Sequence, residues 1–397
     1  MGRLLVDAAA GAPTLDRHLA RHGPLPIRAD LIQLLDTAGL RGRGGGAFPT
    51  AAKLDAVRRR RGRPIVVVNA VEGEPASSKD RALLEVAPHL VLDGAVAAGR
   101  AVGATEAVVA IGEHAAAATA AVRRAIAERP RRPVVVRTVA VAGGFVAGEE
   151  TALLQALAGR APRPALKPPY PFERGLGGAP TLVSNAETLA HVALIARYGA
   201  EWYRSVGAPD APGTALVTLG GAVAHPGVRE VALGSGIHEL IDAAGGATAP
   251  LSAILVGGYF GRWYTPGAAS ALTLTPEVMG AGAILLFPER ACAVREVARV
   301  TDYLAAESAG QCGPCVHGLR AVADALAASA TRDQRASIAR FSAQIVGRGA
   351  CRHPDGVVEF VRSALVVFEE DFRAHAARGA CGRRAVPVLP FAERPAA

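Results

Sequence analysis

Two cysteines with C-x-x-C spacing, Cys312 and Cys315, are the first residues whose types and spacing could do chemistry. The same spacing occurs in thioredoxin-type redox pairs, in zinc sites and in iron–sulfur sites. A redox pair of that kind normally follows a strand, where the start of the next helix lowers the thiol pKa. Here Val297, Val300 and Leu304 recur at helical spacing before the pair, which predicts an amphipathic helix in place of that strand.

A third cysteine, Cys351, lies 36 positions after Cys315 and follows two further runs that predict helices. It opens a second turn with the sequence C-R-H-P-D-G. Three thiols from two turns at one end of a helical bundle can converge on one metal centre. We therefore expect these three cysteines to form a metal site.

The densest glycine run of the chain, residues 39–50, contains a second group of candidate residues. Gly42-x-Gly44-x-x-Ala47 fits the dinucleotide fingerprint formally, but that fingerprint must follow a strand, and here a predicted helix precedes it. The exposed backbone N–H groups of such a loop suit an anionic phosphate. Phe48 and Lys53 could add a stacking face and a counter-charge. A flexible surface loop is the alternative interpretation.

Two acidic turns follow predicted strands. Asn69 and Glu72 end the first strong strand, and Glu149 and Glu150 lie in a turn after a later one. In open α/β sheets, ligands bind at the carboxyl ends of the strands. Asn, Gly and Pro also make turns without any ligand. Two such turns beside a glycine loop suggest a nucleotide cleft.

Strands and helices must alternate to position these residues. β-branched runs predict strands at 64–70, 106–112 and 132–141, and the runs 80–102 and 114–129 predict helices between them. This alternation is typical of an α/β fold with a mostly parallel sheet covered by helices.

The pattern changes from about residue 213. Two short strands flank a His-Pro-Gly turn at 225–227, a short helix follows with Ser235 as its N-cap, and the run 251–258 predicts a third strand. This order is typical of a small β-grasp-like module.

Residues 287–379 predict about four helices. The last of them carries four apolar side chains on one face: Val361, Leu365, Phe368 and Phe372. We therefore expect three domains: an α/β domain at 1–210, a β-grasp-like domain at 211–286 and a helical domain at 287–397.

The composition is that of an ordinary globular protein, with 397 residues of which half are apolar. No stretch approaches the roughly 20 apolar residues of a membrane span, and the first residues lack the features of a signal peptide, so we expect a cytoplasmic protein. Five cysteines are too few for a disulfide scaffold. The net charge of +9 could attract an anionic partner. However, the one basic block, at 58–63, has no interleaved aromatic residues, so we expect no nucleic-acid partner.

Several motifs follow one another in a distinctive order: "GLRGRGGGAFPTAAK", "NAVEGEPASSKDR", "GEETALL", "LKPPYP", "SNAETLA", the β-grasp-like module and the cysteine-bearing helices. In this order the chain resembles, from about residue 30 to 375, the family of flavin-binding, NADH-oxidising subunits of respiratory complex I (the F subunits of NADH:quinone oxidoreductase). Diaphorase subunits of NAD-linked hydrogenases and formate dehydrogenases are related. The resemblance implies a Rossmann-like FMN/NADH domain, a small β-grasp (SLBB-type) domain and a C-terminal four-helix iron–sulfur bundle.

The resemblance also implies an FMN-dependent NADH dehydrogenase. Hydride would pass from NADH to FMN, and single electrons would leave through a [4Fe–4S] cluster to a partner redox subunit such as a ferredoxin-like protein. Because the cofactors carry this chemistry, no catalytic side chain is expected.

The family motifs assign cofactor-binding residues to this chain. Those on the FMN side are Gly42, Arg43, Gly44, Gly45, Gly46, Ala47, Lys53, Asn69, Glu72, Asn185 and Thr188. Those on the NADH side are Phe48, Glu149, Glu150, Lys167 and Tyr170. The rings of Phe48 and Tyr170 would be stacking faces for adenine.

Four positions of the cofactor sites depart from the family motifs. Ala47 follows the glycine run, and a positive φ there would strain it. Val71 replaces an aspartate, Ala56 replaces an aromatic residue, and Ser184 replaces an asparagine. These changes bear on NADH affinity more than on FMN binding.

The cluster motif departs as well, because Ala309 stands where the family has the first of four cysteines. A cubane needs four ligands, so three outcomes stay open: a three-iron cluster, no cluster, or a cluster completed by His353, Ser308, His317 or water. Of the other two cysteines, we expect Cys292 to be a buried core thiol and Cys381 to be a tail thiol, with folding back as a ligand the less favoured alternative.

Two other functions stay open beside the dehydrogenase. Ala309, Val71 and Ala56 favour a cofactor-depleted structural subunit of a redox complex. A weakened adenine site would suit a flavoprotein that takes electrons from a ferredoxin. The departures favour a separate small redox complex over complex I as the host, and such a complex could associate with a membrane.

Overall fold

The computed structural model describes residues 2–5, 13–130 and 133–391. In these ranges the N-terminal half contains a sheet of four parallel strands: β1 (Ile65–Ala70), β2 (Glu106–Gly112), β3 (Val135–Val141) and β4 (Thr181–Asn185). The strand order is β3-β2-β1-β4, so β1 is central. The expected strands are confirmed, except that residue 132, where the third was expected to begin, lies outside the described residues. The fold is mixed α/β with a parallel, Rossmann-like core.

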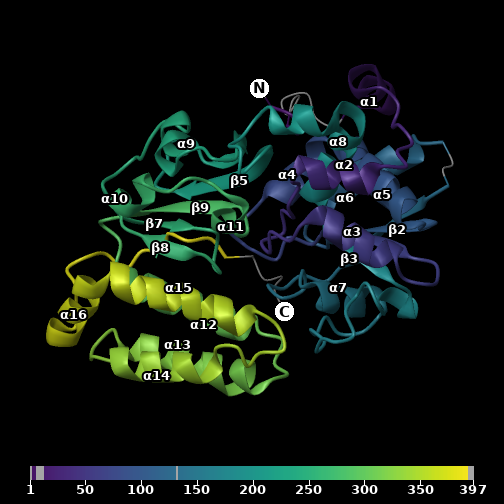
Figure 1. Cartoon of the computed structure of the whole chain (residues 1–397). Coiled ribbons are helices and arrows are strands. Elements are labelled where there is room, and N and C mark those ends of the chain that lie inside the picture. The colour runs from purple at the N-terminus through teal and green to yellow at the C-terminus, as the bar shows by residue number, and fades with distance from the viewer. Residues whose placement is uncertain (1, 6–12, 131–132, 392–397) are drawn as a thin grey trace.

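Helices cover this sheet (Figure 1). They are α1 (Leu15–His22), α2 (Leu31–Ala38), α3 (Thr50–Arg58), α4 (Lys79–Val86), α5 (Pro88–Val102), α6 (Ala116–Ala127), α7 (Glu150–Leu157) and α8 (Ala186–Arg204). A Cβ on Gly94 of α5 would lie 1.8 Å from the carbonyl oxygen of Leu189 in α8. Glycine at this position therefore allows the two long helices to pack closely in the core.

The single helix expected over 80–102 is wrong, because the chain breaks between α4 and α5. Pro88 is the first residue of α5, and Ala87 before it has φ −134° and ψ 50°. A proline lacks the N–H that would continue the helix, and it disfavours helical geometry in the residue before it. The two helices meet at 97°, and they have the length and apolar composition of a membrane span only when taken together. No single helix in the described ranges is both long enough and apolar enough to cross a membrane.

A second, mixed sheet follows, with strand order β6-β5-β9-β7-β8. Its strands are β5 (Thr214–Gly221), β6 (Gly227–Ala232), β7 (Leu251–Val256), β8 (Arg262–Tyr264) and β9 (Ala283–Pro288). The helices beside it are α9 (Ile237–Ala243), α10 (Pro266–Ser270) and α11 (Pro276–Met279). The expected N-cap Ser235 is wrong: Gly236 caps α9, and its N–H donates to the Glu239 carboxylate at 3.0 Å.

The C-terminal part is helical: α12 (Ala293–Ala306), a π-helix (Pro314–Leu319), α13 (Arg320–Ala328), α14 (Arg335–Ile345), α15 (His353–Val367) and α16 (Glu369–Arg378). The last expected helix is in fact two, because the chain turns at Phe368. This turn directs the Phe368 ring onto Trp263, with ring centroids 5.1 Å apart. The predicted apolar face of α12 is confirmed, because Val297, Val300 and Leu304 are fully buried.

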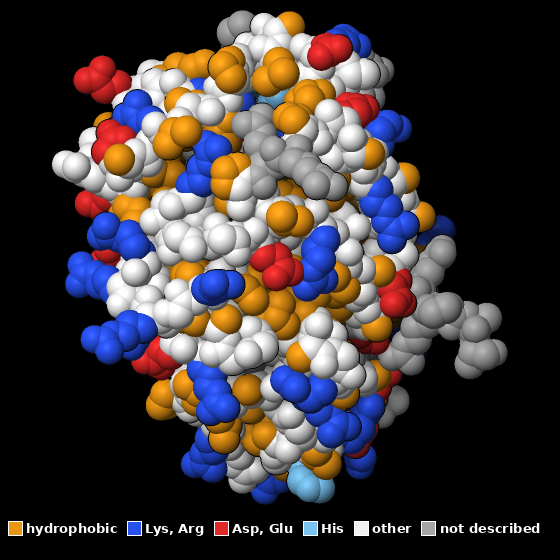
Figure 2. Space-filling view, turned by 90° about the vertical axis from the view of Figure 1, so that its right-hand side faces the viewer, with side chains coloured by type: hydrophobic (Ala, Val, Ile, Leu, Met, Phe, Trp, Pro, Cys, Tyr) orange, Lys and Arg blue, Asp and Glu red, His pale blue; other side chains and the backbone are white. Residues whose placement is uncertain are grey.

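The surface shows how the positive charge is distributed. On the face shown in Figure 2, Lys and Arg side chains are scattered among apolar and acidic ones. On this face the charge therefore does not form the continuous basic stripe of a nucleic-acid footprint.

Candidate functional site

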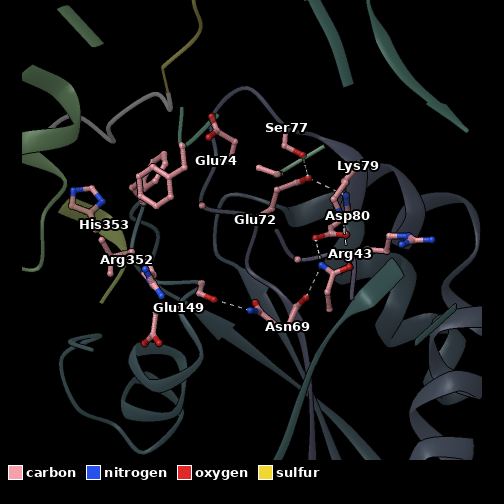
Figure 3. Close-up of a pocket in the computed structure, with 18 of the residues that line it drawn as sticks. Arg43, Asn69, Glu72, Glu74, Ser77, Lys79, Asp80, Glu149, Arg352 and His353 are labelled. Atoms are coloured by element: carbon pink, nitrogen blue, oxygen red, sulfur yellow. Dashed lines mark hydrogen bonds and ion pairs between the residues drawn. The ribbon is translucent and has the colours of Figure 1, made fainter. Parts of the chain in front are cut away.

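A pocket opens at the carboxyl ends of β1 and β4 (Figure 3). Asn69 and Asn185 lie opposite each other in the register of these two parallel strands. The lining comes from the glycine loop, both acidic turns and the start of α15: Arg43, Gly44, Asn69, Glu72, Gly73, Glu74, Ser77, Lys79, Asp80, Phe145, Val146, Gly148, Glu149, Asn185, Phe260, Ala281, Cys351, Arg352 and His353. A ligand in an open α/β sheet is expected at this edge.

The two asparagines connect the strands to neighbouring turns. Asn69 Nδ2 donates to the carbonyl of Gly148 at 2.8 Å, which joins the two acidic turns. Asn185 Oδ1 accepts from the N–H of Glu187 at 3.0 Å and so caps α8, while its Nδ2 donates to Asp80 at 2.6 Å. Both side chains are therefore held in place before any ligand arrives.

A buried group of charges lies behind the asparagines. Lys79 Nζ is 2.9 Å from Asp80 and 2.9 Å from Glu187, and all three side chains are almost fully buried. Burial alone would lower the pKa of Lys79, but the two carboxylates raise it above its ordinary value, so the lysine is charged. Lys79 was not among the expected site residues, because the run S-S-K-D is equally typical of a solvated helix start.

Arg43 holds the glycine loop in place. Its side chain is buried, and its guanidinium donates to the Tyr203 hydroxyl at 2.9 Å and to the carbonyl of Thr214 at 3.1 Å. Its backbone N–H donates to Thr188 Oγ1 at 2.9 Å. Thr188, assigned to FMN by the family motifs, therefore contacts the loop and does not line the pocket.

The glycine loop folds back on itself. The N–H of Gly42 donates to the carbonyl of Phe48 at 2.9 Å. Gly45 has φ 92°, and Ala47 has φ 45°, in the left-handed region. The expected strain at Ala47 is confirmed, because this region is costly for a residue with a Cβ. Gly44 lines the pocket, whereas Gly42, Gly45, Gly46 and Ala47 form the loop around it.

Glu72 serves as a helix cap. Its carboxylate accepts from the backbone N–H of Asp80 at 2.9 Å and of Arg81 at 3.2 Å, at the start of α4, and from Ser77 Oγ at 2.9 Å. Burial raises the pKa of Glu72, and the charge of Asp80 adds to this shift. Glu72 has φ 47°, so the turn after β1 is strained at a residue that lines the pocket.

Four charged residues assigned to the cofactors gather at one side of the pocket: Lys53, expected on the FMN side, and Glu149, Glu150 and Lys167, expected on the NADH side. Lys167 Nζ is 3.1 Å from Glu149 and 2.8 Å from Glu150, and Lys53 Nζ is 3.3 Å from Glu150. Glu149 also caps α7 by accepting from the N–H of Thr151. Of the four, Glu149 lines the pocket.

The two aromatic residues assigned to NADH are exposed. Phe48 is 57% exposed and Tyr170 is 43% exposed, although neither lines the pocket. The Tyr170 ring stacks on Phe172, with centroids 5.4 Å apart. Both exposed rings offer a face on which a planar ligand could stack.

The three expected metal ligands come from the start of the π-helix and from the turn before α15. Cys312 comes just before the π-helix and Cys315 is in its first turn, and the N–H of Cys315 donates to the carbonyl of Cys312 at 3.0 Å. Burial opposes ionisation of Cys312, but the N–H groups of Ala350 and Cys315 lower its pKa below the ordinary value. Burial, with the neighbouring Cys312, raises the pKa of Cys315 to about 12. Cys351 lines the pocket itself.

His353 follows Cys351 by two positions and also lines the pocket (Figure 3). Its Nε2 is 2.8 Å from the carbonyl of Leu304, so Nε2 carries the proton. Burial lowers its pKa, which keeps the ring neutral. In the described part of the chain, Nδ1 is buried and has no hydrogen-bond partner.

Comparison with known proteins gives consistent matches. Residues 35–194 match the Nuo51 FMN-binding domain, and residues 295–375 match the NADH-ubiquinone oxidoreductase-F iron-sulfur binding region. The F subunit of the NADH-quinone oxidoreductase of Mycobacterium tuberculosis is 33% identical over 389 residues, which cover 89% of this chain and 86% of that protein. The second F subunit of the same oxidoreductase in Rhizobium meliloti is 30% identical over 401 residues and 94% of each chain.

A solved structure is similar as well. A chain of the NAD⁺-reducing [NiFe]-hydrogenase in the H2-reduced state is 32% identical and superposes with a TM-score of 0.82 over 87% of this chain. This chain spans 63% of that hydrogenase chain.

Proposed function

The chain belongs to the family of NADH-quinone oxidoreductase F subunits, and on that premise we propose how its own residues serve the family's chemistry. It is an FMN-dependent NADH-oxidising subunit that passes electrons to an iron–sulfur cluster. One observation carries the proposal: Cys351, a cluster ligand, lines the same pocket as Gly44 and Asn69, the flavin-side residues. Flavin and cluster would then be neighbours.

FMN would be held by Gly44, Asn69, Glu72 and Asn185, supported by Arg43 and Lys79 behind them. The donor set fits the group. His353 Nδ1 is a buried acceptor without a partner in the described residues, and the ring N–H of a flavin is a donor. A Cβ on Gly73 would lie 2.6 Å from the carbonyl of Phe145, so the acidic turns approach each other more closely than another residue would allow.

The NADH side would consist of Phe48, Glu149, Glu150, Lys167 and Tyr170. The ion pairs of Lys167 with both glutamates fix these side chains while leaving them partly exposed. Phe48 and Tyr170 would offer their exposed faces to adenine. Lys53, engaged with Glu150, would support this side instead of meeting a flavin phosphate directly.

Cys312, Cys315 and Cys351 would hold the iron–sulfur cluster. Ala309 leaves one corner without a thiolate, and because His353 Nδ1 is assigned to the flavin, Ser308, His317 or a water would complete the cluster. When bound, FMN accepts a hydride and releases single electrons, which an iron–sulfur cluster can take up. The chain's own residues orient these groups and exclude water from between them.

The remaining expectations complete the proposal. The Rossmann-like domain would span 1–210, an SLBB-type β-grasp domain 211–286, and a four-helix iron–sulfur bundle 287–397. The partner would be a redox subunit such as a ferredoxin-like protein, in a small cytoplasmic complex that could associate with a membrane. Purification of the chain together with its partners from the native source tests this assignment. Copurification with the full set of complex I subunits would contradict the proposal of a separate small complex.

The function itself is tested by an anaerobic visible spectrum of the purified chain before and after addition of NADH. We expect flavin absorbance that bleaches on addition, over a broad iron–sulfur shoulder. Flavin that does not respond to NADH but bleaches with reduced ferredoxin would favour the ferredoxin-linked flavoprotein. A colourless protein that takes up neither FMN nor iron would favour the structural alternative.

A further inference from the structure

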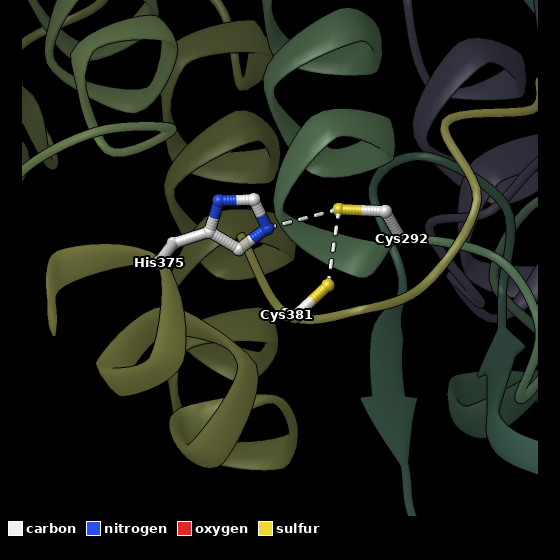
Figure 4. Close-up of side chains that lie close together, drawn as sticks. All are labelled: Cys292, His375 and Cys381. Atoms are coloured by element: carbon white, nitrogen blue, oxygen red, sulfur yellow. Dashed lines mark hydrogen bonds between the residues drawn. The ribbon is translucent and has the colours of Figure 1, made fainter. Parts of the chain in front are cut away.

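A second cluster of potential metal ligands lies outside the site described above. Cys292, His375 and Cys381 bring their ligand atoms within 4.8 Å of one another (Figure 4). Cys292 Sγ is 3.2 Å from His375 Nε2 and 3.5 Å from Cys381 Sγ. The alternative that Cys381 folds back to the other cysteines is therefore wrong, because it lies beside Cys292.

These separations agree with those around one tetrahedral ion. Zinc bonds to sulfur at about 2.3 Å and to imidazole nitrogen at about 2.0 Å, which puts neighbouring ligand atoms about 3.5 to 3.8 Å apart. A small inward or outward adjustment of each side chain would accommodate the ion. Cys292 and His375 are almost fully buried, at 3% and 2% exposure, whereas Cys381 is partly exposed and leaves a route of entry.

The imidazole is already oriented for a metal. His375 Nδ1 is 3.0 Å from the carbonyl of Ala330, which can only accept, so the proton is on Nδ1. The lone pair of Nε2 then faces the two sulfurs. A backbone carbonyl that accepts from the second ring nitrogen is the usual support of a metal-bound histidine.

The site joins three segments that are distant in the sequence. Cys292 is the N-cap of α12, His375 is on α16, and Cys381 is on the segment after α16. That segment pairs with the chain before α12, since the N–H of Cys292 donates to the carbonyl of Arg384 at 2.8 Å. It then runs on to Phe391, whose ring stacks on Tyr303 with centroids 4.4 Å apart.

We propose that Cys292, His375 and Cys381 bind a structural Zn²⁺ ion, which fastens the C-terminal segment to α12 and α16. Two thiolates and an imidazole are the ligand types that select zinc. A water completes the tetrahedron on the exposed side of Cys381. Asp371 is one helical turn before His375, lies largely buried and pairs with Arg383 at 3.3 Å, which makes it the neighbouring carboxylate for that water.

This zinc site is separate from the iron–sulfur site. Cys292 precedes the first residue of α12, whereas His353 bonds to Leu304 near its other end. A helix of 14 residues is about 20 Å long, so the two sites are about one helix length apart. Loss of zinc should therefore leave iron and FMN in place, and the test does not depend on the proposed redox function.

The test measures zinc and iron per chain by mass spectrometry of the full chain, purified under reducing conditions after growth with added zinc. We expect about one zinc per chain, and a loss of about tenfold or more in Cys381→Ser and in Cys292→Ser, with iron unchanged. Cys381→Ser changes a partly exposed side chain, so it should fold even if Cys292→Ser does not. The matched control Cys312→Ser should lower iron and keep zinc.

Zinc X-ray absorption then identifies the ligands. We expect two sulfur neighbours at about 2.3 Å and nitrogen or oxygen neighbours at about 2.0 Å. A zinc chelator should also speed tryptic cleavage after Arg384 severalfold in the wild type, but not in Cys381→Ser. Protein that carries no zinc, zinc that survives Cys381→Ser, or a Cys292–Cys381 disulfide found by non-reducing peptide mapping would each overturn the proposal.

Discussion

Replacing Lys79 by methionine removes the positive centre of the buried charge group behind the pocket. The side chains of Lys79, Asp80 and Glu187 are 4%, 6% and 0% exposed. Methionine keeps much of the volume of the lysine stem but leaves two buried carboxylates without their nearest cation. Removing one partner of a buried pair costs about 3 to 5 kcal/mol. Because Arg43 remains 3.7 Å from Glu187, we expect a loss of about 3 kcal/mol.

The assay is urea unfolding of the full FMN-loaded chain, followed by far-UV circular dichroism and by flavin release. Lys53→Met is the matched control, because Lys53 is 34% exposed and lies 3.3 Å from its carboxylate partner, Glu150. A partly exposed pair of this kind contributes less than about 1 kcal/mol. Lys79→Met should therefore unfold at clearly lower urea than Lys53→Met.

A double variant separates charge from packing. In Lys79→Met with Asp80→Asn, the buried carboxylate whose ion pair with Lys79 was lost is neutral, so we expect part of the lost stability to return. Equal unfolding midpoints for Lys79→Met and Lys53→Met would refute the reasoning. The reasoning would also be refuted if the double variant lost more free energy of unfolding than the two single variants lose together.

Three further predictions follow from the pocket. Ala47→Gly relieves the strain of the positive φ of 45°. Glycine also gives the unfolded chain more conformational entropy, so the net gain in stability should be about 0.5 to 1 kcal/mol. A lower thermal midpoint in the variant would contradict this prediction. Burial raises the pKa of Glu74 to about 7 from 4.5. Between these two pH values the folded chain keeps a proton on Glu74 that the unfolded chain releases. The stability that Glu74 contributes below pH 4.5 is therefore lost as the pH rises through 7. Glu74→Gln should remove this slope, so that between pH 5 and 8 the variant gains about 2 kcal/mol relative to the wild type in urea unfolding; parallel pH profiles would contradict this. Cys351→Ser should reduce the iron content while FMN binding and bleaching by NADH persist, and an unchanged iron content would remove Cys351 from the cluster site.

Features that depend on local pattern were predicted well from the sequence. The strand at 106–112 was expected with its observed bounds, because its apolar run, rich in β-branched residues, is short and buried. The strain at Ala47 followed from its place in a glycine run. The family, too, was identified from its motifs, and the comparisons confirm it.

Features that depend on contacts between distant segments could not be predicted. Lys79 has no local signal that separates a buried lysine from a solvated one, because Glu187 is 108 positions away. Arg43 was assigned only as a member of the glycine loop, yet it is buried against Tyr203 and Thr214 from other elements.

The cysteines show both sides of this division. The sequence by itself determined that Cys312, Cys315 and Cys351 lie at the ends of helices, because helical periodicity and turn residues are local properties of the chain. Only the tertiary structure decided that Cys292 meets His375, 83 positions away, and Cys381, 89 positions away. The physical reason is that the packing of α16 and of the following segment against α12 depends on the whole buried core, and no spacing between neighbours in the sequence encodes it.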